Sequence, residues 1–328
     1  MQCQRPFDGF VGAAHGRDIF ARMPDLLWLT HEYCGLHEMG AGHPESPARL
    51  QAVEQAVAGS ALGPRRLMAE AGPAAPEMLA RVHDPRLVEG LLKAAPKSGY
   101  VQLDADTTMN PHTAEAALRA AGAAVQAVDS ALGGGPAVSF CAVRPPGHHA
   151  ERATPMGFCL FDNVAVAAAH ALERGLSRVA ILDFDVHYGN GTVDIFRGDD
   201  RVLVCNTYQY PLYPFWADGG GAANIVDAPL HPRSGGKEFR EAVSALWQPA
   251  VARHRPELIL VSAGFDAHRD DPLAHLELLE DDYRWVGANI RDWAEASAGG
   301  RVVAALEGGY ALRALGASVV AFLEGTIL

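Results

Sequence analysis

Six short runs of apolar and β-branched residues recur along the chain of 328 residues, and longer amphipathic stretches separate them. Most of the runs are continuously apolar, which is typical of parallel strands that are covered on both faces. Strands and helices that alternate in this way predict βαβ units and an α/β fold with a doubly wound sheet. We expect strands at residues 26–30, 137–143, 178–184, 202–206, 258–263 and 301–306, and helices at 47–57, 112–132, 161–174, 237–254, 280–298 and 311–323.

These patterns continue without a long linker or an internal repeat, so we expect a single domain over residues 1–328. Residues 1–25 are expected to form an N-terminal extension of uncertain order. The glycines at 219–221 indicate a flexible loop within the domain, because strand and helix patterns resume on both sides. Since 49% of the residues are hydrophobic, the chain can build a large core.

Charge, hydropathy and cysteine content exclude several classes of protein. A net charge of −12 disfavours direct binding to nucleic acid, which needs a basic face. No apolar run reaches the roughly 18 residues that a membrane helix needs, and the first residues do not resemble a secretory signal. Five cysteines without a Cys-x-x-Cys pair argue against a disulfide framework and favour a cytoplasmic protein.

Four of the predicted strands end in residues that can bind metals or transfer protons. In a doubly wound sheet, ligands bind beyond the carboxyl ends of the strands, so these residues are expected to converge on one site. The segments are Arg144–His149, Asp185–Gly191, Gly264–His268 and Glu307–Tyr310.

Asp185 and His187 stand two residues apart at a strand end, where side chains at i and i+2 point to the same side. An isolated Asp-x-His is more often a hydrogen-bonded turn. Asp266, at an equivalent strand end, completes one imidazole and two carboxylates, the three-ligand pattern of a catalytic metal site with an open position. The sequence therefore predicts a metal site formed by these three residues.

The pair His148 and His149 follows Arg-Pro-Pro-Gly, which holds the backbone in a defined turn. A neutral imidazole can remove a proton from an attacking water and return it to a leaving amine. Tyr310 could donate a hydrogen bond to a developing oxyanion, although a packed aromatic side chain is an equal alternative for this motif alone. Asp183 and Asn190 are placed to orient the two histidines. Together the residues suggest metal-assisted hydrolysis of an amide.

From about His31 to its end, the chain resembles the histone deacetylase superfamily, specifically the class II-like bacterial amidohydrolases, a group that includes acetylpolyamine amidohydrolases. The resemblance rests on eight segments that occur in the order of the family. They are 43–50 (HPESPARL), 103–107 (LDADT), 144–149 (RPPGHH), 157–159 (GFC), 183–187 (DFDVH), 189–192 (GNGT), 264–266 (GFD) and 307–310 (EGGY).

The resemblance implies an arginase/deacetylase fold with an eight-stranded parallel sheet flanked by helices. It also implies one catalytic Zn²⁺ held by the predicted triad. The ligand set itself leaves Fe²⁺ as an alternative, since Fe²⁺ can also occupy a His/Asp₂ site. A structural K⁺ is expected beside it. The residues at matching K⁺ positions, several through backbone carbonyls, are Asp183, Asp185, His187, Asn206 and Thr207.

The same resemblance assigns roles to the other residues. His149 would act as general base and then acid, and Asn190 would contact it, while His148 would be its electrostatic partner, oriented by Asp183. Tyr310 would polarise the acyl carbonyl. For the tunnel that takes an acyl-lysine chain, the resemblance points to Gly157, Phe158 and Tyr213 as walls, and to Asp106, with Asp104 as the alternative, at the rim.

Two segments depart from the family pattern. Tyr188 stands where a second histidine is common, so we expect a local change in packing. Residues 214–221 replace a Pro-Gly-Thr-Gly turn and a longer glycine-rich loop beside the tunnel mouth. Phe215 and Trp216 lie in this segment. They either line the rim of the tunnel or simply pack against neighbouring side chains.

One residue bears on the choice of substrate. Leu273 occupies the position at which polyamine-selective relatives carry a glutamate, and an apolar side chain cannot pair with a second ammonium group. We therefore expect an acyl-lysine peptide, protein or similar amide as the substrate. The alternatives are an acetylpolyamine or a small acyl amide or ester, an inactive acyl-lysine-binding protein, and an arginase-like enzyme with two Mn²⁺ ions. The sequence leaves the oligomeric state open.

Overall fold

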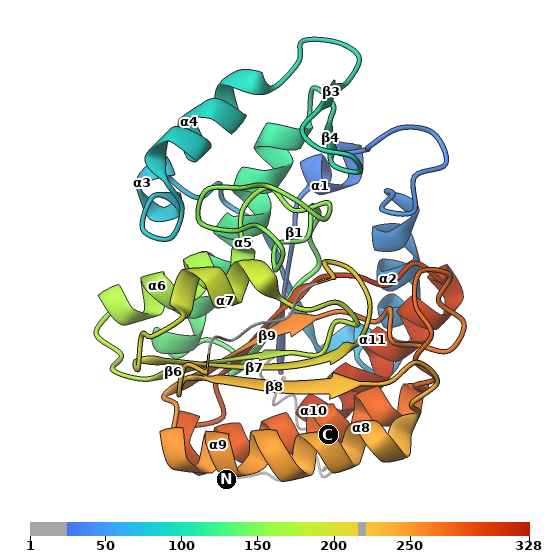
Figure 1. Cartoon of the computed structure of the whole chain (residues 1–328). Helices are drawn as coiled ribbons and strands as arrows, with labels where there is room; N and C mark the ends of the chain where they lie inside the picture. Colours follow the sequence, from blue (N-terminus) through green and yellow to red (C-terminus); the bar gives the residue numbers. More distant parts are fainter. Residues whose placement is uncertain (1–24, 216–220) are drawn as a thin grey trace, which may run out of the picture.

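A computed structural model describes residues 25–215 and 221–328. A central sheet runs through the molecule (Figure 1). It consists of eight parallel strands in the order β2-β1-β5-β10-β9-β6-β7-β8. The predicted α/β fold with an eight-stranded parallel sheet is confirmed. The strands are β1 (Leu26–Thr30), β2 (Arg66–Glu70), β5 (Val138–Cys141), β6 (Val179–Asp183), β7 (Val202–Gln209), β8 (Ile225–Leu230), β9 (Leu258–Ala263) and β10 (Val302–Leu306), with a separate hairpin of β3 (Val101–Gln102) and β4 (Thr108–Met109).

Helices cover both faces of the sheet (Figure 1). One face packs against α3 (Pro76–Leu79), α4 (Pro85–Ala94), α5 (Thr113–Leu132), α6 (Asn163–Glu173) and α7 (Asn190–Phe196), and α1 (Glu32–Leu36) joins this side. The other packs against α2 (Ala48–Ala58), α8 (Gly236–Ala242), α9 (Gln248–His254), α10 (Glu280–Trp293) and α11 (Leu312–Ile327), with the π-helical turns η2 (Val243–Trp247) and η3 (Ala294–Ala298) extending α8 and α10. A short 3₁₀ turn, η1, covers Gly63–Arg65. No helix in these ranges is long and apolar enough to cross a bilayer.

Successive residues of a strand enter opposite cores, which explains the continuous apolar runs. Leu27 and Leu29 of β1 belong to the core beneath α5, whereas Leu26 and Trp28 belong to the core beneath α11. Each position is therefore buried on one face or the other, as expected for a parallel sheet between two helical layers.

All six expected strands are present, with ends that differ by a few residues. The expected strands did not include β2 and β8, which form the two edges of the sheet. Their burial is incomplete, and β8 contains Pro229 and Asp227 in place of a continuous apolar run. Apolar patterning cannot reveal an edge strand of this kind.

The four strands whose ends carry polar motifs are neighbours in the middle of the sheet, in the order β5-β10-β9-β6. Their carboxyl ends meet at one edge, so the loops that follow them share one site. Residues 1–24 and 216–220 lie outside the described residues. The N-terminal extension, Trp216 and most of the expected glycine loop therefore stay predictions.

Candidate active site

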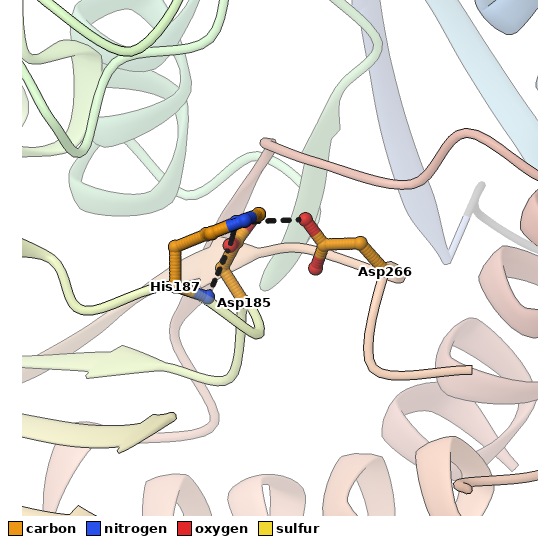
Figure 2. A group of neighbouring side chains, drawn as sticks. All are labelled: Asp185, His187 and Asp266. Atoms are coloured by element: carbon orange, nitrogen blue, oxygen red, sulfur yellow. Dashed lines mark hydrogen bonds and ion pairs between the residues drawn. The ribbon is translucent and has the colours of Figure 1, made fainter. Parts of the chain in front are cut away.

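The loops after β6 and β9 bring Asp185, His187 and Asp266 together, and their side chains point toward one another (Figure 2). One ligand atom from each residue lies within 4.8 Å of the others. Nδ1 of His187 is 3.0 Å from Oδ1 of Asp185 and 3.2 Å from Oδ2 of Asp266. The residues that the sequence groups as metal ligands thus share one small volume.

The charges and contacts of this triad fit a divalent cation. Among the described residues, the buried Oδ2 of Asp266 has no partner other than the 3.2 Å contact with Nδ1 of His187, so two buried carboxylates share one imidazole, and a cation would balance their remaining charge. Burial alone would lower the pKa of His187, but the two carboxylates raise it to about 10. Gly308 approaches so closely that a Cβ there would lie 2.0 Å from Oδ2 of Asp266, so glycine is required. One imidazole and two carboxylates are a ligand set that suits zinc.

The two histidines after β5 have different partners. Nδ1 of His148 is 2.9 Å from Oδ2 of Asp183, and Nδ1 of His149 is 2.6 Å from Oδ1 of Asn190. The ring centroids are 4.0 Å apart. The arrangement keeps the sequence-predicted pairing of both histidines.

The electrostatic environments separate the pKa values of this pair. Burial opposes a charge on His148, but the Asp185 and Asp183 carboxylates hold its pKa well above the usual value. Burial lowers the pKa of His149, and the charges of His148 and His187 lower it further. These opposite shifts favour a charged His148 and a neutral His149, a division that suits a base beside an electrostatic partner.

A cavity of about 210 Å³ is lined by His148, His149 and His187. Phe158 and Tyr213 contribute aromatic rings to it, and the ring of Tyr213 meets that of His149 edge-on with centroids 5.0 Å apart. Gly157 packs on His149, since a Cβ there would lie 2.5 Å from Cδ2 of the imidazole. The lining residues are Asp106, Pro146, His148, His149, Gly157, Phe158, His187, Leu212, Tyr213, Phe215, Leu273, Gly308 and Tyr310.

The structure separates two alternatives at the rim. Asp106 lines the cavity, whereas the carboxylate of Asp104 accepts the backbone N–H groups of Asp106 and Thr107, at 3.0 and 2.6 Å. Phe215 also lines the cavity and is 76% exposed, so it lies at the mouth and not in a packed core. Tyr188, which replaces a common histidine, is buried and packs edge-on against Tyr208.

Comparison with known proteins gives this geometry a context. Residues 43–326 match the histone deacetylase domain. The chain belongs to the histone deacetylase family. A histone deacetylase-like amidohydrolase of Pseudomonas aeruginosa is 39% identical over 278 residues, which cover 82% of this chain and 73% of that protein. Polyamine deacetylase HDAC10 of Homo sapiens is 36% identical over 84% of this chain and 43% of its own length.

The crystal structure of the HDA15 HD domain superimposes with a TM-score of 0.86 at 32% identity, and the match covers 92% of this chain and 88% of that one. The predicted arginase/deacetylase fold is therefore confirmed. Family membership supports an enzyme that acts on acyl amides, in a family that is generally metal-dependent.

Three side chains of this histone deacetylase family member hold the backbone of the site, and the sequence-based prediction gave them no role. Glu307 accepts the N–H groups of Gly147 and His148 at 2.6 and 3.2 Å. Asp271 accepts the N–H of Tyr310 at 2.7 Å, and Arg49 donates to the carbonyl of Gly309. Their positions in the sequence could have indicated a role. Glu307 and Arg49 lie inside motifs that carry the family resemblance, and Asp271 lies two residues before Leu273.

Glu45 is the centre of a second buried group. It accepts a hydrogen bond from Arg49 at 3.0 Å and pairs with Arg144, while His37 lies 3.4 Å away. Burial alone would raise the pKa of Glu45, but the charge of Arg144 and hydrogen bonds from His37 and Arg144 hold it well below the usual value. Arg49 also donates to the carbonyl of Gly309 in the loop after β10, and Arg144 begins the loop after β5, so Glu45 links two of the loops that form the site.

We expect Glu45→Gln to lower the free energy of unfolding at pH 7 by about 3–5 kcal/mol, because two buried arginines lose their counter-charge. A depressed pKa stabilises the folded state above the usual glutamate value near 4.5, and this contribution is lost as the pH falls further. The gap between wild type and variant should narrow below about pH 4.5. Urea unfolding at pH 7 and at lower pH measures this difference in the free energy of unfolding. Glu241→Gln, at an exposed glutamate, is the control. A gap that is absent at pH 7, or constant with pH, would contradict this assignment.

Proposed function

We propose that this protein is a zinc-dependent amidohydrolase that removes acetyl or other acyl groups from N-acyl-lysine-like amides. The observation that carries the proposal is the convergence of the Asp185, His187 and Asp266 ligand atoms within 4.8 Å, with His187 of this triad and the imidazole of His149 lining one cavity. Tyr310 lines the same cavity. A metal triad, a base and an oxyanion donor on one cavity are the parts that amide hydrolysis needs.

Asp185, His187 and Asp266 would hold the ion. When bound, a divalent ion at this position lowers the pKa of water and polarises an amide carbonyl. His149 accepts the proton of the attacking water at Nε2, because Nδ1 is engaged with Asn190, and later returns it to the leaving amine. His148 stabilises the developing negative charge as a cation, and the Tyr310 hydroxyl donates a hydrogen bond to the carbonyl oxygen.

A structural K⁺ near Asp183, Asp185, His187, Asn206 and Thr207 belongs to the same proposal. Asp183 of β6 and Asn206 of β7 are register partners in the sheet. Among the described residues, Oδ1 of Asn206 is buried and accepts no hydrogen bond, which supports a cation in this region.

The cavity walls support a lysine-like chain as the substrate. Phe158, Tyr213 and Leu273 present apolar surface, which suits a run of methylene groups, and Leu273 offers no partner to a second ammonium group. The similarity to a polyamine deacetylase keeps acetylpolyamines as the second candidate.

Turnover of an acetyl-lysine peptide and of N-acetylputrescine by zinc-reconstituted protein tests this choice. We expect the peptide to be preferred, and Leu273→Glu to shift the ratio of kcat/KM values toward acetylputrescine by at least about tenfold, because one new ion pair becomes available. Leu246→Glu, at an exposed leucine that does not line the cavity, should leave the ratio unchanged. A wild-type preference for acetylputrescine would reject the assignment based on Leu273.

Metal analysis of the same preparation separates the remaining classes. One zinc per chain with turnover supports the amidohydrolase. One zinc without turnover of any acyl amide would favour an acyl-lysine-binding protein, and two ions would favour a dinuclear enzyme.

A further inference from the structure

The amide of Asn190 lies between the base and a second carboxylate. Asn190 is the first residue of α7 and is fully buried. Its Oδ1 is 2.6 Å from Nδ1 of His149, and its Nδ2 is 2.9 Å from Oε1 of Glu151. Nδ2 also lies 3.4 Å from the carbonyl of His149 and 3.4 Å from Sδ of Met156.

Donor and acceptor chemistry fixes the orientation of this amide. A carboxylate and a carbonyl can only accept hydrogen bonds, so the side of the amide that faces Glu151 must be the NH₂ group. Oδ1 must then face His149, and an amide oxygen can only accept. Nδ1 of His149 therefore carries the hydrogen, which leaves the lone pair on Nε2.

Glu151 itself is held in place from two sides. Its N–H donates to the carbonyl of Thr154 at 2.9 Å, and its carbonyl accepts from Nδ1 of His83 at 3.0 Å. Nε2 of His83 accepts the N–H of Asp162, so this imidazole is neutral with its hydrogen on Nδ1. Burial, which lowers the pKa of His83 to about 4, keeps it so. The loop that carries Glu151 is thus fixed to the start of α6.

We propose that Glu151 is a positioning residue that selects the base-competent tautomer of His149 through Asn190. This inference rests on the proposed function, in which Nε2 of His149 accepts the proton of water. Without Glu151, Nδ2 of Asn190 keeps only the 3.4 Å contacts with the carbonyl of His149 and Sδ of Met156. The side-chain amide could then flip by 180°. The NH₂ group would then face Nδ1 of His149, and the ring would carry its hydrogen on Nε2, where it cannot accept a proton.

Steady-state kinetics of the zinc-reconstituted full chain on an acetyl-lysine peptide tests this. Glu151→Leu is expected to lower kcat by at least about tenfold with little change in KM, the lower end of the range typical of residues that orient functional groups. Glu151→Gln keeps an acceptor oxygen and should remain near the wild-type kcat. Glu173→Leu, at an exposed glutamate away from the cavity, is the matched control.

A smaller loss in Glu151→Leu, a dominant rise in KM, or an equal loss in Glu151→Gln would overturn the inference. Nitrogen-15 NMR of histidine-labelled wild-type protein, without metal, reads the tautomer directly and does not depend on a variant that folds. A hydrogen on Nδ1 of His149 is expected, and a hydrogen on Nε2 would refute the proposal. Wild-type protein that shows the expected tautomer but hydrolyses no acyl amide would instead reject the proposed function.

Discussion

Asp266→Asn is expected to abolish tight zinc binding, with a loss of at least about a hundredfold in affinity and a matching loss of turnover. The substitution replaces one of the two buried carboxylates of the triad, Asp185 and Asp266, by a neutral amide of the same shape. Oδ1 of Asp266 accepts the N–H of Val186 at 2.9 Å, and an asparagine oxygen can keep that bond. The fold should therefore tolerate the change while the ligand set loses a charge.

Zinc content after dialysis and the shift in Tm on adding zinc measure the effect. Wild-type protein should be stabilised by the ion, because a ligand that binds the folded state raises its stability by mass action. Asp266→Asn should show little shift, and exposed Asp292→Asn should behave like wild type. One tightly bound zinc in the Asp266 variant would place the ion elsewhere.

Tyr310→Phe is expected to lower kcat by about 10²–10³ with a small change in KM, the magnitude seen when one oxyanion donor is removed. Burial holds the pKa of the Tyr310 hydroxyl well above its usual value, so the group is available as a donor at neutral pH. Its main-chain N–H is bound by Asp271, and the guanidinium of Arg49 lies 4.9 Å from its ring centroid. Neither contact, one to the backbone and one to the ring, involves the hydroxyl, so its loss should leave the ring in place.

The control is Tyr100→Phe, at an exposed tyrosine whose hydroxyl contacts Glu38. Zinc content should be unchanged in both variants, which separates the hydroxyl from the metal site. A kcat for Tyr310→Phe within a few-fold of wild type would remove Tyr310 from the reaction.

Much of this site could be predicted because parallel strands all point their carboxyl ends to one edge. Asp185 and His187 are two residues apart, and Asp266 follows another strand, so the triad could be proposed before the order of the strands was known. The order of the strands in the sheet could not be predicted. Hydrophobic periodicity shows that a strand is buried, but it does not show which strand lies beside it. The structure makes β9 and β6 neighbours, and this brings Asp266 to the other two.

The supporting side chains were harder to predict for a different reason. Glu151, Glu307 and Asp271 act on amide and main-chain N–H groups, and a sequence pattern does not show which N–H a carboxylate faces. Asp104 shows the same difficulty. It shares a short acidic segment with Asp106, yet its carboxylate turns to the backbone while Asp106 lines the cavity.

The place of β10 has a consequence for biosynthesis. This strand, at residues 302–306, lies between β5 and β9, which precede it in the chain. Without β10, the strand order leaves two separate blocks, β2-β1-β5 and β9-β6-β7-β8, each with an unpaired edge, and this is the arrangement open to the chain before β10 emerges from the ribosome. Unpaired strand edges are prone to aggregation, so a nascent chain needs protection until this late strand inserts. Since the loop after β10 also carries Tyr310, the same insertion that closes the sheet completes the lining of the cavity.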